Sequence, residues 1–176
     1  MKILLSRRFM GLFISLALIF ALCVTFSPAQ QKIKVAGKLT CAITKLESIN
    51  FDDTEDHTIA LMKYEGINFS KGEHEFMNGG QTVGVTFGDL IKGTGPHQGY
   101  GKMSLNGDVV FWKYKGKTTT TLSPKGKPIA TFEGTLTWNK GAGQYENIQG
   151  SGTYKGKYLT EVIWVTKWEG EYFIKK

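Results

Sequence analysis

Three side chains that could together move a proton lie close to one another in the sequence. Asp89, His97 and Tyr100 supply a carboxylate, an imidazole and a phenol, and they flank the glycine-rich segment 93–99. Groups of these types act as general acids and bases when they converge on a substrate. If segment 93–99 is a loop at the edge of the fold, they are the candidate catalytic residues. Residues of these types also form hydrogen bonds within turns, which is the alternative interpretation.

The other titratable residues match no metal site and no nucleophile motif. None of the histidines, His57, His74 and His97, has a second histidine two or four positions away, as strong zinc sites do. The acidic segment 52–57 could hold calcium, but it lacks the EF-hand spacing and central glycine, so we interpret it as a solvated loop. The chain contains no G-x-S-x-G and no P-loop. We therefore predict no metal and no cofactor.

A second group of candidate residues is aromatic and suited to binding rather than catalysis. Trp112, Tyr114, Trp138, Tyr158 and Trp164 fall at alternating positions that share a face with other rings, threonines and glycines but almost no charge. Small-molecule sites are mostly apolar with a few polar groups. These five are the candidate ligand-binding residues, and the alternative is that their rings simply fill the interior of the fold.

The elements that must position these rings carry a repeated three-residue phrase: an aromatic residue, a charged residue and a glycine. It occurs at 64–66, 114–116, 132–134, 154–156 and 168–170. Because residues i and i+2 of a strand share a face, each ring is expected to cover the glycine of its own phrase. Aromatic cover over a glycine kink helps a sheet curl into a barrel. The charges of successive phrases, such as Glu133 and Lys155, are expected to pair outside it.

Alternating hydrophobicity and turn signals predict an all-β fold. The expected strands are 33–45, 57–69, 81–91, 99–105, 108–122, 129–140, 151–167 and 168–174. Asn106-Gly107 is a tight hairpin signal. Eight short strands without a linker predict a single antiparallel β-barrel domain over residues 30–176. Cys41 lies on an apolar alternating face and is interpreted as a small buried residue.

The same face assignment places apolar residues on the outside of the expected barrel. Leu159, Ile163 and Val165 point outward on the expected strand 151–167, as do Ile59 and Leu61 on strand 57–69. Exposed apolar patches usually meet another surface, and closed symmetry is the common outcome for soluble oligomers. We therefore expect a homo-oligomer with strand 151–167 in the contact.

Residues 1–29 have the layout of a secretory signal peptide. Lys2, Arg7 and Arg8 precede an apolar run over 9–26 and a small-residue cleavage site at 27–29. The alternative is an uncleaved membrane anchor. Cleavage predicts a secreted or periplasmic protein without stable membrane insertion. Segment 68–70 is an N-glycosylation sequon, relevant only in a eukaryotic host.

The remaining chain has 19 lysines and no arginine, against 15 acidic residues. Because bidentate recognition of phosphates and bases relies on arginine, we expect no nucleic-acid partner. A single remaining cysteine cannot form an internal disulfide.

Residues 132–138 and 141–154 resemble a stretch of allene oxide cyclase-like and dirigent-like barrels. In those families a strand ends in a G-x-G-x-aromatic turn, here 141–145, then one short helical turn follows, and G-x-G, here 150–152, leads into the next strand. The resemblance covers about residues 130–156. It implies an eight-stranded antiparallel barrel, often trimeric, with an apolar cavity.

These observations favour an exported, noncatalytic β-barrel that binds a small apolar or aromatic ligand. The resemblance implies one alternative, a cyclase- or isomerase-like enzyme acting on a lipid-like substrate. The lysine-rich exterior is compatible with another, a surface-interaction protein of the cell envelope.

Overall fold

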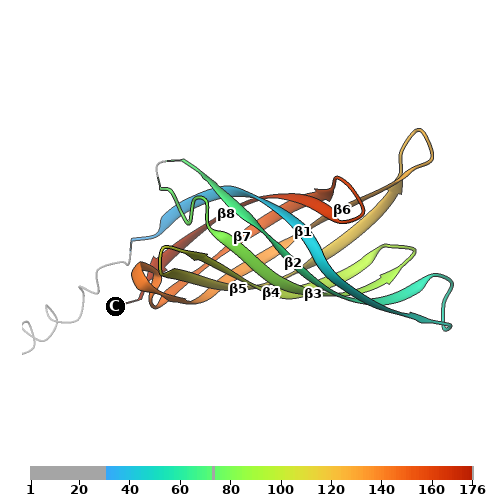
Figure 1. The fold of residues 1–176 in the computed structure, drawn as a ribbon, viewed down its shortest axis with the longest axis horizontal. Coiled ribbons are helices and arrows are strands. Elements are labelled where there is room, and N and C mark those ends of the chain that lie inside the picture. Colours follow the sequence, from blue (N-terminus) through green and yellow to red (C-terminus); the bar gives the residue numbers. More distant parts are fainter. Residues whose placement is uncertain (1–30, 73, 176) are drawn as a thin grey trace, which may run out of the picture. The chain divides into compact units, whose positions relative to one another are not determined.

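The computed structural model describes residues 31–72 and 74–175, so the expected signal peptide at 1–29 lies outside the described residues. Within them the chain forms a closed antiparallel barrel in which the strands follow chain order and β8 pairs back onto β1 (Figure 1). The strands are β1 (Ile33–Phe51), β2 (His57–Lys71), β3 (Gln81–Ile91), β4 (Gly95–Leu105), β5 (Asp108–Leu122), β6 (Pro128–Ala142), β7 (Ile148–Tyr158) and β8 (Ile163–Ile174). The predicted all-β barrel of eight strands is confirmed.

Two local predictions about the chain between β6 and β8 had different outcomes. A 3₁₀ turn, η1 (Gly143–Tyr145), stands where the family resemblance implied one short helical turn. The expected strand 151–167 is wrong, because the chain reverses after Tyr158 and re-enters the sheet at Ile163. Leu159 therefore lies in a turn, and only Ile163 and Val165 share a strand. Among the described residues, no helix has the length and hydropathy needed to cross a bilayer.

The aromatic rings do cover glycines, but not the glycines of their own phrases. Tyr64 covers Gly84: a Cβ atom built on that glycine would lie 2.3 Å from the Tyr64 ring. The two residues are directly opposite each other on β2 and β3. The same opposed arrangement recurs for Trp112 over Gly101, Tyr114 over Gly99, Phe132 over Gly156 and Trp168 over Gly37. The ring leans across to the next strand, so each pair fixes the register between two strands.

The faces predicted for the inner and outer sides are otherwise correct. Cys41 is buried, and burial raises the pKa of its thiol to about 12, as expected for an inert core cysteine. Outside the barrel, Glu133 and Lys155 lie opposite each other and form an ion pair of 3.0 Å. Ile59 and Leu61 lie on the outer side of β2, as predicted, and half of Leu61 is exposed.

The two ends of the barrel are built differently. Because consecutive strands are antiparallel neighbours, the turns β1–β2, β3–β4, β5–β6 and β7–β8 gather at one end, on the right in Figure 1, which we call the hairpin end. The β2–β3 loop, the β4–β5 turn and η1 gather at the other. The β2–β3 loop inserts Phe76 and Met77 there, each 1% exposed, so we call this the plug end.

Aromatic contacts hold the plug in place. The Phe76 ring lies 5.4 Å from that of Trp138, 5.1 Å from Tyr145 and 5.2 Å from Tyr172, measured between centroids. Edge-to-face and tilted contacts of this kind add to the free energy gained by burial. This end of the barrel is therefore filled by side chains.

Asn68 ties the same loop to the barrel. Its Nδ2 donates hydrogen bonds to the backbone oxygens of Phe76 (2.9 Å) and Met77 (3.0 Å), and its Oδ1 accepts one from Trp168 Nε1 (3.0 Å). The side chain is fully buried. The sequon at 68–70 is therefore inaccessible to a glycosyltransferase in the folded protein, and Asn68 has a structural role.

Candidate functional site

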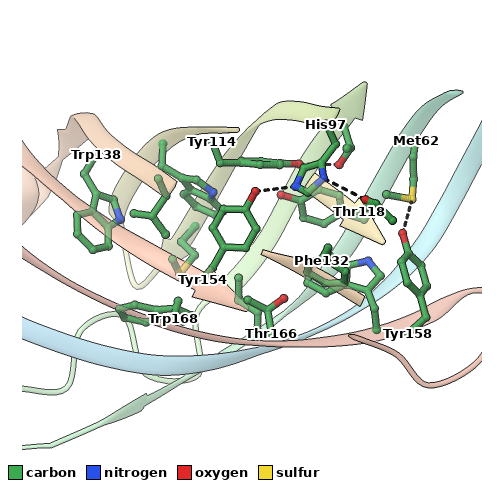
Figure 2. A pocket seen from close by; sticks show the side chains of 17 residues that line it. Met62, His97, Tyr114, Thr118, Phe132, Trp138, Tyr154, Tyr158, Thr166 and Trp168 are labelled. Carbon is green, nitrogen blue, oxygen red and sulfur yellow. Dashed lines mark hydrogen bonds between the residues drawn. The ribbon is translucent and has the colours of Figure 1, made fainter. Parts of the chain in front are cut away.

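A cavity of about 80 Å³ lies inside the barrel (Figure 2). Its wall includes all five aromatic residues that the sequence predicted for ligand binding: Trp112, Tyr114, Trp138, Tyr158 and Trp164. They come from β5, β6, β7 and β8 and project inward because alternate residues of each strand face the interior. The sequence left open whether the rings fill the barrel or line a cavity. The structure shows both, with filling at the plug end and a cavity beyond it.

The cavity is more accessible from the hairpin end. Trp138 and Trp168, nearest the plug, are 2% and 4% exposed, whereas Met62, Thr118 and Tyr158 are half-buried. The Tyr158 hydroxyl contacts Met62 Sδ at 3.8 Å, a weak hydrogen bond between two flexible side chains. These residues form the rim past which a ligand would enter.

His97 is the most polar residue of the cavity wall. Its Nε2 shares a hydrogen bond of 2.6 Å with the Tyr154 hydroxyl, and its Nδ1 one of 3.0 Å with Thr118 Oγ1 (Figure 2). Burial lowers the pKa of the imidazole, so His97 is neutral at neutral pH. A neutral imidazole donates through one nitrogen and accepts through the other, which matches a hydroxyl partner on each side.

A second polar pair lies on the neighbouring wall. Tyr114 donates its hydroxyl proton to the backbone oxygen of Val85 (3.1 Å), and its oxygen lies 2.6 Å from Thr86 Oγ1, which then acts as the donor. Burial raises the pKa of Tyr114 to about 12, and burial together with the nearby Tyr114 raises the pKa of Tyr154 further. The cavity therefore carries no charge at neutral pH and suits an uncharged guest.

Two polar atoms of the wall have no hydrogen-bond partner. Trp164 Nε1 and Thr166 Oγ1 are both buried, in residues that are 7% and 4% exposed. They lie two positions apart on β8 and therefore on the same, cavity-facing side. A buried polar group without a partner costs about 1–3 kcal/mol. The wall thus offers a donor and a hydroxyl that nothing in the protein satisfies.

The expected catalytic group of Asp89, His97 and Tyr100 is not brought together. The segment expected as a loop is mostly strand, since β4 begins at Gly95, so His97 and Tyr100 lie on one strand at i and i+3 and face opposite sides. His97 points inward, whereas Tyr100 is 65% exposed on the outer face. Asp89 bonds to His57 at the hairpin end. Only His97 of the three belongs to the cavity.

His57 lies between two carboxylates outside the cavity. Its Nδ1 is 2.6 Å from Asp53 Oδ1 and its Nε2 is 2.9 Å from Asp89 Oδ1. The hydrogen bonds to Asp53 and Asp89, in that order, raise the pKa of His57, and His57 lowers the pKa of Asp53. The contact joins the β1–β2 turn to β3. Over residues 31–72 and 74–175, no group of three or more potential metal ligands occurs.

Sequence reasoning missed the partners of His97, although one signal was present. Gly99, Gly101 and Met103 alternate with charged and polar residues and face inward. Extending that alternation two residues towards the N-terminus would have placed His97 on the inner face. Its contacts with Tyr154 and Thr118 depend on strands β5 and β7, and the local pattern of β4 contains no information on them.

Comparison with known proteins adds little to this geometry. No known protein family and no curated protein sequence matches the chain. Among solved structures, the chain is similar to a pterocarpan synthase dirigent protein, with a TM-score of 0.46 and 9% identity over 86% of this chain and 94% of that one. Identity this low carries no information on ligand or activity.

Proposed function

We propose that the barrel is a noncatalytic binding protein for a small, uncharged aromatic molecule that carries a hydrogen-bonding oxygen. The observation that carries this proposal is the pair of unpartnered atoms, Trp164 Nε1 and Thr166 Oγ1, in a cavity otherwise lined by rings. Small-molecule sites combine an apolar wall with a few polar groups that fix the ligand's orientation. An oxygen on the ligand can accept from the indole N–H and exchange a hydrogen bond with the threonine hydroxyl.

The size of the cavity restricts the ligand. A dry cavity of about 150 Å³ in another protein holds benzene, whereas this one measures about 80 Å³. We infer a ligand of one ring at most, and binding it requires the half-buried side chains of Met62 and Tyr158 to turn outward and enlarge the cavity at the rim. A long lipid does not fit this volume.

Tryptophan fluorescence tests the proposal directly, because Trp112, Trp138 and Trp164 line the cavity. Benzyl alcohol and benzaldehyde are titrated against toluene, which has the same ring without oxygen. We expect the oxygen-bearing compounds to bind about tenfold tighter, the equivalent of one good hydrogen bond. Equal affinities, or no fluorescence change with any of the three, contradict the proposal.

Two variants identify the atoms responsible. Thr166→Val is expected to reduce the preference for oxygen, with the Trp164 N–H as the remaining donor, while leaving the affinity for toluene unchanged. Thr82→Val is the matched control, because Thr82 Oγ1 is also buried without a partner but lies outside the cavity wall. A preference that Thr166→Val leaves unchanged, or an ordered water that bridges both atoms and that none of the compounds displaces, rules out the assigned contact.

A second candidate, a cyclase- or isomerase-like enzyme, is favoured by one observation only. The neutral His97 and the Tyr154 hydroxyl, joined by 2.6 Å, could take a proton from a bound carbonyl compound and return it. NMR of small cyclic ketones in D₂O tests this function. Exchange of the α-hydrogen for deuterium supports an enzyme if the His97→Gln variant no longer catalyses it. Exchange no faster than in buffer alone excludes this chemistry for the ketones used.

The proposal includes export, for which the support is the signal-peptide layout of residues 1–29. Fractionation of cells that express the full chain tests it. Release of a shortened chain into the periplasm or medium is the expected result. Retention of the uncleaved chain in the membrane fraction indicates an anchor instead.

A further inference from the structure

Strand β1 has a free edge at the hairpin end. β1 pairs with β8 only from Ile33 to Ala42, but with β2 as far as Phe51. The last link on the β8 side is the hydrogen bond from Ile43 N to Val162 O, at 2.8 Å. In Figure 1, β1 runs on past the β7–β8 turn towards the tip of its hairpin. In the described chain, segment 44–51 has β2 on one side and no strand on the other.

The composition of this edge favours pairing with another strand. A free edge presents unpaired backbone N–H and C=O groups, which other chains can use as a template. Proteins usually block such edges with lysine and other charged side chains, with proline or with a bulge within the exposed part. Segment 44–51 carries only two charges, Lys45 and Glu47, which are opposite in sign. Here the bulge lies where the free segment begins, between Ile43 and Lys45, and segment 44–51 contains no proline or glycine. Leu46 and Ile49 are 58% and 63% exposed.

The charges of segment 44–51 match those of a second copy of the same segment that runs antiparallel to it. Lys45 and Glu47 lie opposite Lys63 and Leu61 of β2, so both point to the outer face. If two copies of the edge meet antiparallel about a two-fold axis at Leu46, Lys45 of each copy lies opposite Glu47 of the other. Leu46 then meets Leu46, and both ion pairs form on the same face. Opposite charges at directly opposed positions stabilise antiparallel strands.

We propose that the protein forms a two-fold dimer through segment 44–51 of β1, in the register centred on Leu46. Such a contact is isologous and closes, because both copies use the same segment of the same edge. The dimer joins the sheets of two barrels beside the rims of their cavities. This inference does not depend on the proposed ligand.

The mass in solution and a charge exchange test the dimer. Light scattering on the purified protein is expected to give twice the monomer mass at micromolar concentration. Lys45→Glu and Glu47→Lys each replace two attractive pairs by two repulsive ones and should weaken dimerisation about tenfold or more. The double variant Lys45→Glu/Glu47→Lys restores opposite charges in this register and should recover the dimer.

Strand β2 supplies a matched control. Lys63 and Glu65 form an exposed ion pair two residues apart, at 3.1 Å, like Lys45 and Glu47 at 2.5 Å, but β2 is paired on both sides. Glu65→Lys breaks this β2 pair and should leave the dimer intact, because Glu65 lies opposite Ala42, outside segment 44–51. Far-UV circular dichroism confirms that each variant keeps its sheet.

Three outcomes overturn the inference. The first is a monomer at all concentrations. The second is a dimer that Lys45→Glu leaves unchanged, or that the double charge exchange fails to restore. The third is a dimer lost on Ile163→Lys but kept in Lys45→Glu, which would place the contact on the surface that the sequence predicted instead.

Discussion

The plug end and the hairpin end of this barrel use the same kinds of residue for opposite purposes. At the plug end, Phe76 contacts a set of buried rings, and Asn68, which ties the loop to the barrel, has its hydrogen bonds satisfied. Beyond the plug, rings surround a cavity, two polar atoms lack partners, and the rim residues are half-buried. The loop that inserts Phe76 accounts for the difference, because among the described residues no hairpin at the other end buries a side chain in this way.

This contrast indicates which residues of the barrel contribute to stability and which are available for binding. A close-packed core whose polar groups are hydrogen-bonded contributes to the free energy of folding. A cavity with unpaired polar groups costs free energy unless a ligand recovers it. We therefore expect substitutions near the plug to change stability, and substitutions near the cavity to change binding.

The largest expected effect is the loss of the plug. Phe76→Ala should lower the free energy of unfolding by about 3–5 kcal/mol, because it opens a cavity in a filled core. Urea unfolding followed by circular dichroism measures the change. Leu122→Ala, at a position 73% exposed at the hairpin end, is the control and should change stability by about 0.5 kcal/mol or less. Similar losses for both variants would contradict the comparison between the two ends.

The next effect concerns the amide that ties the plug to β8. Asn68→Leu should cost about 2–4 kcal/mol, since it leaves Trp168 Nε1 and two carbonyl oxygens buried without partners. Asn50→Leu at the hairpin end removes one exposed hydrogen bond, to Thr58, and should have little effect. The same urea titration compares them. A stable Asn68→Leu variant would show that water or a rearranged loop satisfies these groups.

The two histidines should give stability opposite dependences on pH. Burial lowers the folded pKa of His97, so the unfolded chain binds the proton first and His97 reduces stability as pH falls below about 6.5. The carboxylates raise the folded pKa of His57, so its contribution is complete below about pH 6.5 and is lost as pH rises through the raised value.

Urea unfolding at several pH values, on wild type and on each His→Gln variant, checks both signs. His97→Gln should lessen the loss of stability in acid, and His57→Gln should be most costly in acid and least costly at alkaline pH. The same slope for both variants would show that the two environments do not differ as the contacts indicate.

The smallest expected effect is on the outer surface. Lys155→Glu should destabilise the fold by a few tenths of a kcal/mol, and adding Glu133→Lys should recover about half or more of that loss, because both side chains are exposed. A double-mutant cycle measures the coupling. Additive losses would show that the 3.0 Å pair contributes no interaction energy in solution, and that register depends on the ring and glycine pairs alone.

The inner and outer faces of most strands could be predicted from the sequence, because the alternation of side chains is a local property of the backbone. The inner position of Cys41, the five rings of the cavity wall and the outer charges at Glu133 and Lys155 all follow from it. The number of strands also follows, since glycine, asparagine and proline mark most of the turns. The β7–β8 turn was missed because segment 159–162 contains none of these residues.

Contacts between strands were decided only in the tertiary structure. Tyr64 covers Gly84 rather than Gly66, and His97 meets Tyr154 rather than Asp89 and Tyr100, because a ring or an imidazole contacts whatever the register places beside it. A shift of one residue in register would turn each of these side chains to the other face. Closure of the barrel also determined that β1 has no neighbour on its β8 side beyond Ile43. The sequence therefore determined which residues face inward, and the pairing of the strands determined which of them form a site.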